Sequence, residues 1–262
     1  MSNSDIIFES GMHIYDHLVI HTPHAGKILP IVVNGPQGRG GYERRKGLTP
    51  IFNKLTDHYT DKLFSTTLIN TTQVSFPYSR LFCDVERLVD DPLEQKGLGI
   101  CPNFGIYKDS GTVHTWNMTK KQAMELYQKH HQTLYHSMSL EKVGGNLLLD
   151  CHSFSEHDNV LCPNAHEYTD IEICLGYNED ISKPSPDTLE GVAHFFSQRG
   201  YRVAFNVPFS NAMTVGNESF LNESLMIEVN KHCYMNEETL EINDGYYKLH
   251  NELQELYKLL LK

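Results

Sequence analysis

Five short apolar runs along the chain have the length and composition of buried strands. They are His17–Ile20, Leu147–Leu149, Ile171–Leu175, Arg202–Phe205 and Leu225–Ile227. Runs this short, bounded by polar or turn-forming residues, favour strands over helices. Because segments with helical spacing lie between them, the pattern predicts an α/β fold with a mixed, mostly parallel sheet and helices on both faces. We expect a single domain over residues 1–262.

Two longer segments repeat apolar residues at the spacing of a helix. One has Thr119 as its predicted N-cap and continues in steps of four, three and four through Ala123, Tyr127, His130 and Leu134. The other, near the C-terminus, forms a leucine stripe at Leu249, Leu253, Leu256 and Leu260. Both stripes predict helices packed on a core. The glycine-rich residues 34–47 predict a surface loop or, alternatively, a lid near a site.

Charge, cysteine content and hydropathy exclude several classes of protein. The formal net charge of −11 argues against a nucleic-acid partner, whose phosphates require a basic surface. The six cysteines show no CxxC spacing and the opening residues MSNSDIIFES carry no signal-peptide pattern, so we expect a reduced, cytoplasmic protein. No apolar run approaches the length of a membrane span, and a membrane partner is not expected. The oligomeric state stays open.

Polar side chains follow four of the apolar runs at the point where each run ends. They are His21 and His24, Asp150 and His152, Asn206, and Glu228 and Asn230. In open α/β sheets, ligands bind beyond the carboxyl ends of the strands, so we expect these side chains to form a site. Glu228 stands among apolar residues, where a carboxylate is costly to bury unless it is paired or functional. Imidazole and carboxylate ligands suit zinc or a similar divalent ion.

Each of these residues also has a structural explanation. A histidine after a strand is often a hydrogen-bonded structural residue, and Asp150 would then cap a turn or orient His152. The placement of such groups after several strands favours a site over coincidence.

The stretch FPYSRLFCDVERLVDDP, residues 76–92, adds a second charged group. Arg80 and Arg87 bracket a segment that we interpret as strand-like, in which Asp84 and Glu86 share a face by the period of two. The segment predicts either a surface ladder of salt bridges or an arginine fork for a substrate carboxylate.

Taken in order, several stretches of the chain resemble the N-formylglutamate amidohydrolase family over residues 17–240. They are HTPHAG, DHYTDKLF, FPYSRLFCDVER, DCHSF, FNVPFS and SLMIEVNKHCYMNE. The resemblance implies a fold similar to that of zinc carboxypeptidases and aspartoacylase, of the phosphorylase/hydrolase-like kind. It also implies metal-dependent hydrolysis of an N-formyl or N-acyl amino acid, typically N-formyl-L-glutamate to L-glutamate and formate, as in histidine degradation.

The resemblance further implies roles for individual residues. His24 and His152 are the implied metal ligands, and Glu228 is the implied catalytic glutamate. The carboxypeptidase-like enzymes take another ligand three residues after the first histidine, where this chain has Lys27. Glu86 is therefore the preferred third ligand, with His21 as the alternative.

The remaining predicted roles concern the substrate and the transition state. Arg87 is expected to bind the substrate carboxylate, and Arg80 to help stabilise the tetrahedral oxyanion. Asn206 and His131 are further predicted substrate contacts, although His131 is equally well explained as a histidine packed on a helix. Two alternative functions remain: a metallopeptidase acting on short peptides, and a binding protein with a degenerate site.

Overall fold

The computed structural model describes residues 12–29, 52–89, 91–102, 119–139, 145–155, 165–215 and 222–262. The chain divides into two compact units. Unit 1 comprises Met1–Thr22, Tyr59–Val74 and Leu134–Lys262, and unit 2 comprises Pro23–His58 and Ser75–Thr133. The expectation of a single domain over residues 1–262 stays a prediction, and the predicted loop at residues 34–47 lies outside the described residues.

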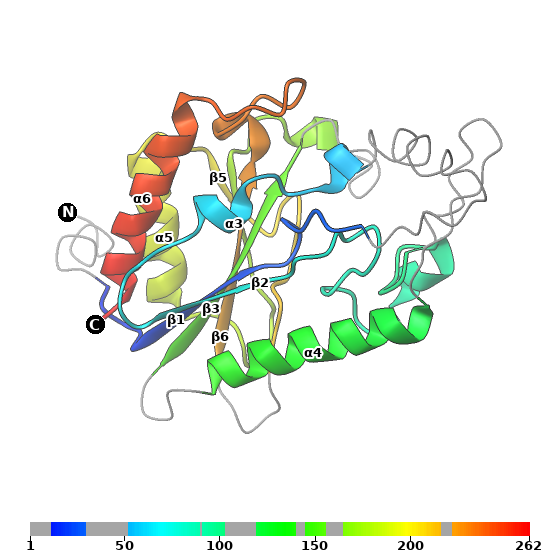
Figure 1. Cartoon of the computed structure of the whole chain (residues 1–262). Coiled ribbons are helices and arrows are strands. Elements are labelled where there is room, and N and C mark those ends of the chain that lie inside the picture. Colours follow the sequence, from blue (N-terminus) through cyan, green and yellow to red (C-terminus); the bar gives the residue numbers. More distant parts are fainter. Residues whose placement is uncertain are drawn as a thin grey trace. The chain divides into compact units, whose positions relative to one another are not determined.

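Unit 1 is built on a mixed sheet with the strand order β2-β1-β3-β6-β4-β5 (Figure 1). The strands are β1 (His17–Thr22), β2 (Thr71–Ser75), β3 (Asn146–Phe154), β4 (Ile173–Gly176), β5 (Val203–Phe205) and β6 (Glu223–Asn230). Strands β1, β3 and β6 are parallel, β4 pairs antiparallel with β6, and β5 is parallel to β4. The predicted α/β fold with a mixed sheet is confirmed.

All five apolar runs of the sequence form strands, whereas β2 escaped the sequence pattern. Its residues read TTQVS, and only Val74 among them is buried. A strand with one buried residue has no apolar alternation by which it could be recognised.

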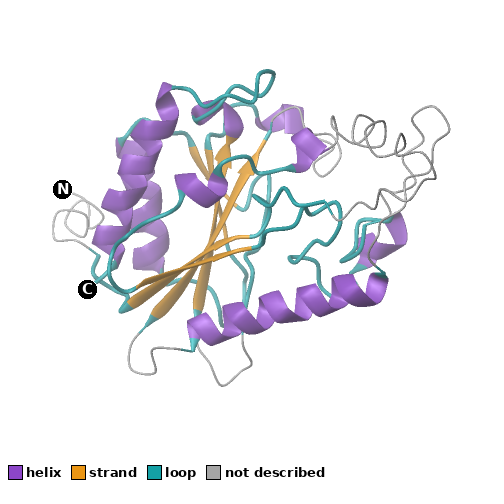
Figure 2. Cartoon of the chain, in the orientation of Figure 1, coloured by secondary structure: helices purple, strands orange, loops and turns teal. Residues whose placement is uncertain are grey.

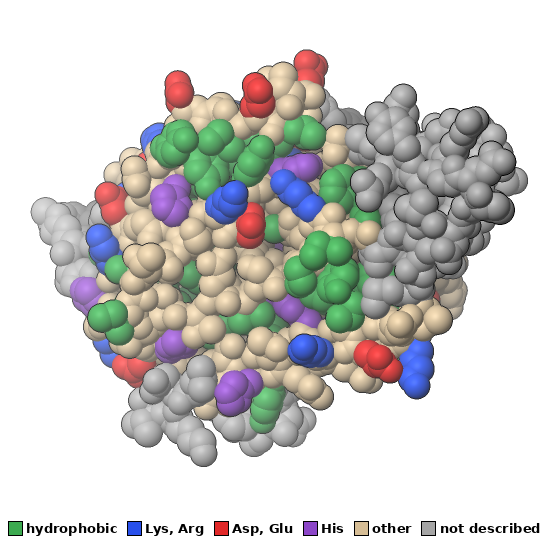
Figure 3. Space-filling model, viewed as in Figure 1, with side chains coloured by type: hydrophobic (Ala, Val, Ile, Leu, Met, Phe, Trp, Pro, Cys, Tyr) green, Lys and Arg blue, Asp and Glu red, His purple; other side chains and the backbone are tan. Residues whose placement is uncertain are grey.

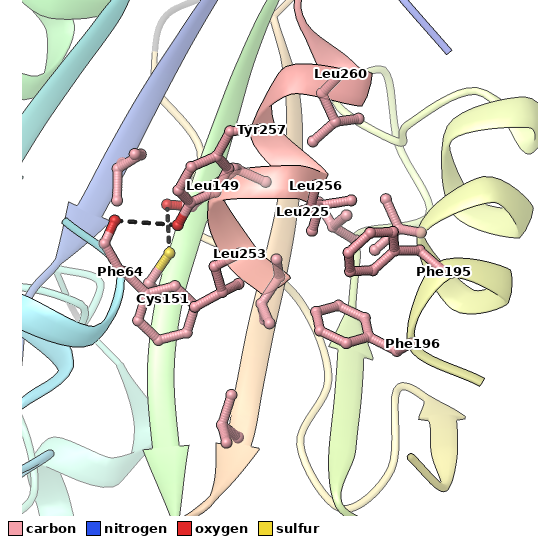
Figure 4. Close-up of a cluster of buried hydrophobic side chains, with 14 of the residues drawn as sticks. Phe64, Leu149, Cys151, Phe195, Phe196, Leu225, Leu253, Leu256, Tyr257 and Leu260 are labelled. Carbon is pink, nitrogen blue, oxygen red and sulfur yellow. Dashed lines mark hydrogen bonds between the residues drawn. The ribbon is translucent and has the colours of Figure 1, made fainter. Parts of the chain in front are cut away.

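One face of the sheet is covered by α5 (Pro186–Gln198) and α6 (Asp244–Leu260), as Figure 2 shows. Leu149 and Leu225 of the sheet pack there against Leu253 and Leu256 of α6 and against Phe195 of α5 (Figure 4). The four leucines of the predicted C-terminal stripe are all fully buried in this core. The short helix α3 (Thr60–Leu63) contributes Leu63 to the same core.

The other face of the sheet carries a smaller apolar cluster that includes the last turn of α4 (Lys120–Met138). Val19 of β1 and Leu148 of β3 pack there with Leu134 and Met138. Because side chains alternate along a strand, polar residues two positions beyond Val19 and Leu148 project from this same face. This alternation places the predicted site residues of β1 and β3 opposite the helices α5 and α6.

Unit 2 has its own core, formed around the N-terminal part of α4. Its members are Phe76, Phe82, Cys83, Val85, Ile100, Ala123 and Tyr127. The predicted N-cap of α4 is confirmed: Gln122 N donates to Thr119 Oγ1 over 3.3 Å, and Thr119 N donates to Gln122 Oε1 over 2.9 Å. The 3-10 helix η1 (Pro92–Lys96) belongs to this unit.

The prediction of a strand-like segment between Arg80 and Arg87 is wrong, because these residues form successive turns. Ser79 begins them: its carbonyl oxygen accepts from Phe82 N and Cys83 N, and its hydroxyl oxygen accepts from Leu81 N. Local hydrogen bonds of this kind compete with a strand ladder.

Two short elements complete unit 1, namely η3 (Ala165–Tyr168) and η4 (Lys231–Cys233). No helix among the described residues is long and apolar enough to cross a membrane. Figure 3 shows acidic and basic side chains intermixed on the face in view, without a continuous basic stretch among those described there.

Candidate active site

Three pairs of residues on neighbouring strands of unit 1 bring the predicted site residues of β1, β3 and β6 into two adjacent rows of the sheet. His21 of β1 is in register with Asp150 of β3, and His152 of β3 is in register with Glu228 of β6. Glu228 is in turn opposite Cys174 of β4. Because residues paired in register, and residues two positions apart on one strand, project from the same side of a sheet, both rows lie on the face opposite α5 and α6.

Asp150 connects the two rows. Its Oδ1 atom accepts hydrogen bonds from His21 Nδ1 (2.9 Å) and His152 Nε2 (3.1 Å), and its Oδ2 atom accepts from Met213 N (2.8 Å). Burial alone would raise the pKa of Asp150, but His152 and His21 hold that pKa well below its usual value. An ionised carboxylate that fixes two imidazole rings is the partner that metal-binding histidines commonly have.

Glu228 lies near the carboxyl end of β6, and its side chain is 8% exposed. Its neighbours Ile227 and Val229 are fully buried in the core under α5 and α6, so the strand alternation directs Glu228 to the site face. Across the strand pair, burial and then the charge of Glu228 raise the pKa of the Cys174 thiol to about 12. Glu228 therefore has a neutral thiol on one side and the His152 position on the other.

Asp84 is the corresponding centre of unit 2. Its Oδ1 atom accepts from His24 Nε2 (2.9 Å) and from Glu86 N (3.2 Å). Its Oδ2 atom accepts from Arg80 Nη2 (2.8 Å) and Nε (3.2 Å), and Arg87 Nε lies 3.5 Å away. Burial would raise the pKa of Asp84, but Arg80, His24 and Arg87 hold it well below its usual value.

The second ring nitrogen of His24 faces two further carboxylates. His24 Nδ1 lies 3.7 Å from Asp57 Oδ2 and 3.9 Å from Glu86 Oε2. Two ligand atoms that each lie ~2.1 Å from a tetrahedral zinc ion are about 3.4 Å apart, so these separations are close to those of a metal site. Burial and then the charge of Arg80 lower the pKa of His24, which favours the neutral imidazole that metals bind. The donor set of one imidazole and two carboxylates fits a divalent ion.

The predicted ligands are thus distributed over both units. His24 and Glu86 meet within unit 2, whereas His152 belongs to unit 1. His21, the alternative third ligand, shares Asp150 with His152. Sequence reasoning assigned no role to Asp57, although it opens the stretch DHYTDKLF that carried part of the family resemblance.

The two predicted substrate arginines differ in their accessibility. The side chain of Arg80 is 11% exposed and that of Arg87 is 20% exposed. Arg80 directs two of its nitrogens at Asp84, while Arg87 makes one longer contact with the same carboxylate. Arg87 is therefore the better placed of the two to meet a second carboxylate.

Helix α4 fastens the turn that carries Arg87. Tyr127 donates its hydroxyl hydrogen bond to Arg87 O (2.9 Å), and His131 Nε2 donates to Val85 O (2.7 Å). The rings of Tyr127 and His131 also lie against each other, with centroids 4.2 Å apart. The Nε2 atom of His131 thus holds the turn by its hydrogen bond. The predicted contact of His131 with the substrate stays a prediction.

Asn206 follows β5, and the sequence placed it at the same sheet edge as the other site residues. That placement is wrong, because β4 and β5 run opposite to β6 and their carboxyl ends point the other way. Asn206 Oδ1 accepts a hydrogen bond from Tyr177 N over 2.9 Å. Its predicted role in substrate binding stays untested.

Known proteins provide an independent comparison. The family model described as N-formylglutamate amidohydrolase matches residues 16–235. Among solved structures, the N-formylglutamate amidohydrolase of Ralstonia eutropha JMP134 is similar, with a TM-score of 0.70 and 20% identity over 94% of both chains. A gene product of Agrobacterium tumefaciens is similar with a TM-score of 0.54 and 14% identity over 96% of this chain and 92% of its own. No protein with a curated description matched the chain.

Proposed function

Because the chain belongs to the N-formylglutamate amidohydrolase family and is thus a hydrolase of amides, we propose that it acts on N-formyl-L-glutamate with the help of a divalent metal ion. Water adds to the formyl carbon, the C–N bond breaks, and formate and L-glutamate are released. We further propose zinc as the metal, on the imidazole and carboxylate character of the donors.

One observation carries the metal proposal: each predicted histidine ligand directs one ring nitrogen at a buried aspartate. His24 pairs with Asp84 and His152 pairs with Asp150. Such a pairing fixes the ring and raises the basicity of its other nitrogen, as in metal sites with a supporting carboxylate. The ligands in the proposal are His24, Glu86 and His152, with His21 as the alternative to Glu86. Glu86 Oε2 lies 3.9 Å from His24 Nδ1, and Asp57 Oδ2 lies 3.7 Å from the same nitrogen, so Asp57 is a further candidate ligand.

The chain's own residues divide the remaining work. When bound, the metal lowers the pKa of a coordinated water and polarises the amide carbonyl. Glu228 accepts the proton of the attacking water and delivers it to the leaving amine, a role that suits a carboxylate with little access to bulk water. Asp150 holds His152 and His21 in one orientation throughout.

Two arginines explain how a protein with a net negative charge binds a negatively charged substrate. Arg87 binds a substrate carboxylate, since its guanidinium is the more exposed of the pair and is already positioned by the backbone contact with Tyr127. Arg80 is held at Asp84 and contributes positive charge toward the developing oxyanion.

Formate release from purified protein tests the proposal. We expect N-formyl-L-glutamate to be hydrolysed faster than N-formyl-L-glutamine, which lacks the side-chain charge, and faster than a glutamate-containing dipeptide. Treatment with a chelator should abolish the activity, and added Zn²⁺ should restore it. Faster cleavage of the dipeptide would contradict the substrate, and full activity in demonstrably metal-free protein would contradict the metal.

A further inference from the structure

A second group of side chains of metal-binding type lies in unit 1, where the start of β4 lies beside the end of its antiparallel partner β6. Glu172 directly precedes β4, and His232 and Cys233 lie in η4, the short helix that follows β6. One ligand atom from each of the three lies within 4.8 Å of the others. We propose that Glu172, His232 and Cys233 form a binding site for one zinc-like divalent ion, separate from the group of side chains around Asp150.

Asn230 connects the two backbone segments that carry this group. Asn230 is fully buried, and its main-chain N–H donates to Glu172 O over 2.8 Å. Its side chain donates to Ile171 O (3.2 Å) and accepts from His232 N (3.3 Å). Asn230 therefore links the segment that carries Glu172 to the turn that carries His232 and Cys233. Three ligands positioned in advance by one buried asparagine need little backbone movement to bind an ion.

The side chains of Glu172 and His232 are already oriented toward each other. Glu172 Oε2 accepts from Arg202 N (3.0 Å) and Nε (3.3 Å), and the second oxygen, Oε1, lies 3.6 Å from His232 Nε2. This separation is close to the ~3.4 Å expected for two light ligand atoms on a tetrahedral zinc ion. Cys233 Sγ is the third ligand atom of the group and lies within 4.8 Å of the other two. The His232 side chain is 41% exposed, so an ion reaches the site from solvent.

The ligand types select the class of ion. A thiolate, an imidazole and a carboxylate, with water in a fourth position, suit zinc, whereas magnesium and calcium prefer oxygen ligands alone. Metals bind cysteine as the thiolate, so the Cys233 thiol has to lose its proton. Binding forms a metal–sulfur bond and releases that proton to solvent, without any change in oxidation state.

The proposed ion would connect two neighbouring strands of the sheet. It joins the start of β4 to the end of β6, the strand on which Glu228 lies. The proposal does not rest on the proposed catalytic metal, because the ligands predicted for that metal include no cysteine.

This difference in ligands allows the two sites to be told apart with Co²⁺ as the probe. Chelator-treated full-length protein is titrated with Co²⁺, and the near-ultraviolet charge-transfer band of thiolate-bound cobalt is recorded. We expect the band in the wild-type protein and its loss in Cys233→Ser. The matched control is Cys101→Ser, which alters another half-buried cysteine, in unit 2, and should keep the band.

A second ligand variant guards against misfolding of Cys233→Ser. His232→Gln changes an exposed side chain, and we expect it to weaken Co²⁺ binding at least tenfold by the same band, while His136→Gln on the surface of α4 does not. His152→Ala should leave the band intact. The absence of a charge-transfer band at saturating Co²⁺ in wild-type protein, or its persistence in Cys233→Ser, would overturn the proposal.

Discussion

The phenol of Tyr127 donates a hydrogen bond to the main-chain carbonyl oxygen of Arg87, 2.9 Å away. This contact ties the part of α4 that belongs to unit 2 to the turn that presents the predicted substrate arginine. Tyr127→Phe removes the hydrogen bond and keeps the ring, so we expect Arg87 to lose orientation. KM for N-formyl-L-glutamate should rise several-fold with little change in kcat, and stability should fall by about 1 kcal/mol. The control is Tyr135→Phe, an exposed tyrosine of the same helix.

Arg87→Lys tests recognition of the substrate carboxylate directly. Lysine keeps the positive charge but loses the planar fork that binds a carboxylate through two parallel hydrogen bonds. We expect KM for N-formyl-L-glutamate to rise by roughly tenfold while kcat changes little, measured by steady-state formate release. An unchanged KM with a collapsed kcat would instead assign Arg87 to the stabilisation of the transition state.

Glu228→Gln separates a general base from a structural carboxylate. Glutamine preserves the volume of a side chain that is 8% exposed, so fold and metal content should be retained. Turnover should fall by roughly two to four orders of magnitude, the usual contribution of a positioned proton acceptor. Thermal stability, metal content and initial rate are to be measured on one preparation. A stable, metal-loaded variant with near wild-type turnover would show that another group is the base.

His152→Ala tests the predicted metal ligand that belongs to unit 1. A site with three protein ligands loses much of its affinity when one imidazole is removed, so we expect most of the bound zinc to be lost on dialysis. Elemental analysis provides the measurement, and His136→Ala on the exposed side of α4 is the control. Retention of stoichiometric zinc by His152→Ala, after correction for zinc bound at Cys233, would remove His152 from the ligand set.

The pKa of Asp84 predicts an acid-dependent part of the stability. Arg80, His24 and Arg87 hold the pKa of Asp84 in the folded protein well below the usual value, against the effect of burial. The resulting stabilisation is therefore complete at pH values above ~3.9, the pKa of an aspartate in the unfolded chain. It is lost as the pH falls from there through the folded-state pKa. Denaturant unfolding between pH 7 and pH 2 should give a steeper acid loss for wild type than for Asp84→Asn. Asp187→Asn, at an exposed position of α5, should follow the wild-type curve.

The strands of unit 1 could be predicted because burial leaves a direct trace in the sequence. Continuous apolar runs such as Leu147–Leu149 occur where both faces of a parallel strand are covered. Strand β2 carries no such trace, since it buries only Val74. Strand direction was also beyond the sequence, because it depends on which strand a segment pairs with. The wrong sheet edge was predicted for Asn206 because the direction of β5 could not be read from the sequence.

The candidate site was predictable residue by residue, but its organisation was not. Sequence reasoning found His24, His152 and Glu228, whose positions after or within apolar runs are informative. It assigned no central role to Asp84, because turns formed by local hydrogen bonds have no periodicity. The pairing of Asp150 with both His21 and His152 required the register of two strands, which only the folded chain defines.

The strict alternation of side chains along β3 limits which insertions and deletions the gene can tolerate at this strand. Asp150 and His152 face the candidate site, whereas Leu149 and Cys151 between and beside them are fully buried in the opposite core. The insertion or deletion of a single codon before Asp150 would turn every following side chain of the strand to the other face. Ionised groups would then enter the core, and apolar groups would replace them at the site. Changes in length at this strand should therefore be tolerated only in pairs of residues, whereas substitutions can be sampled one position at a time.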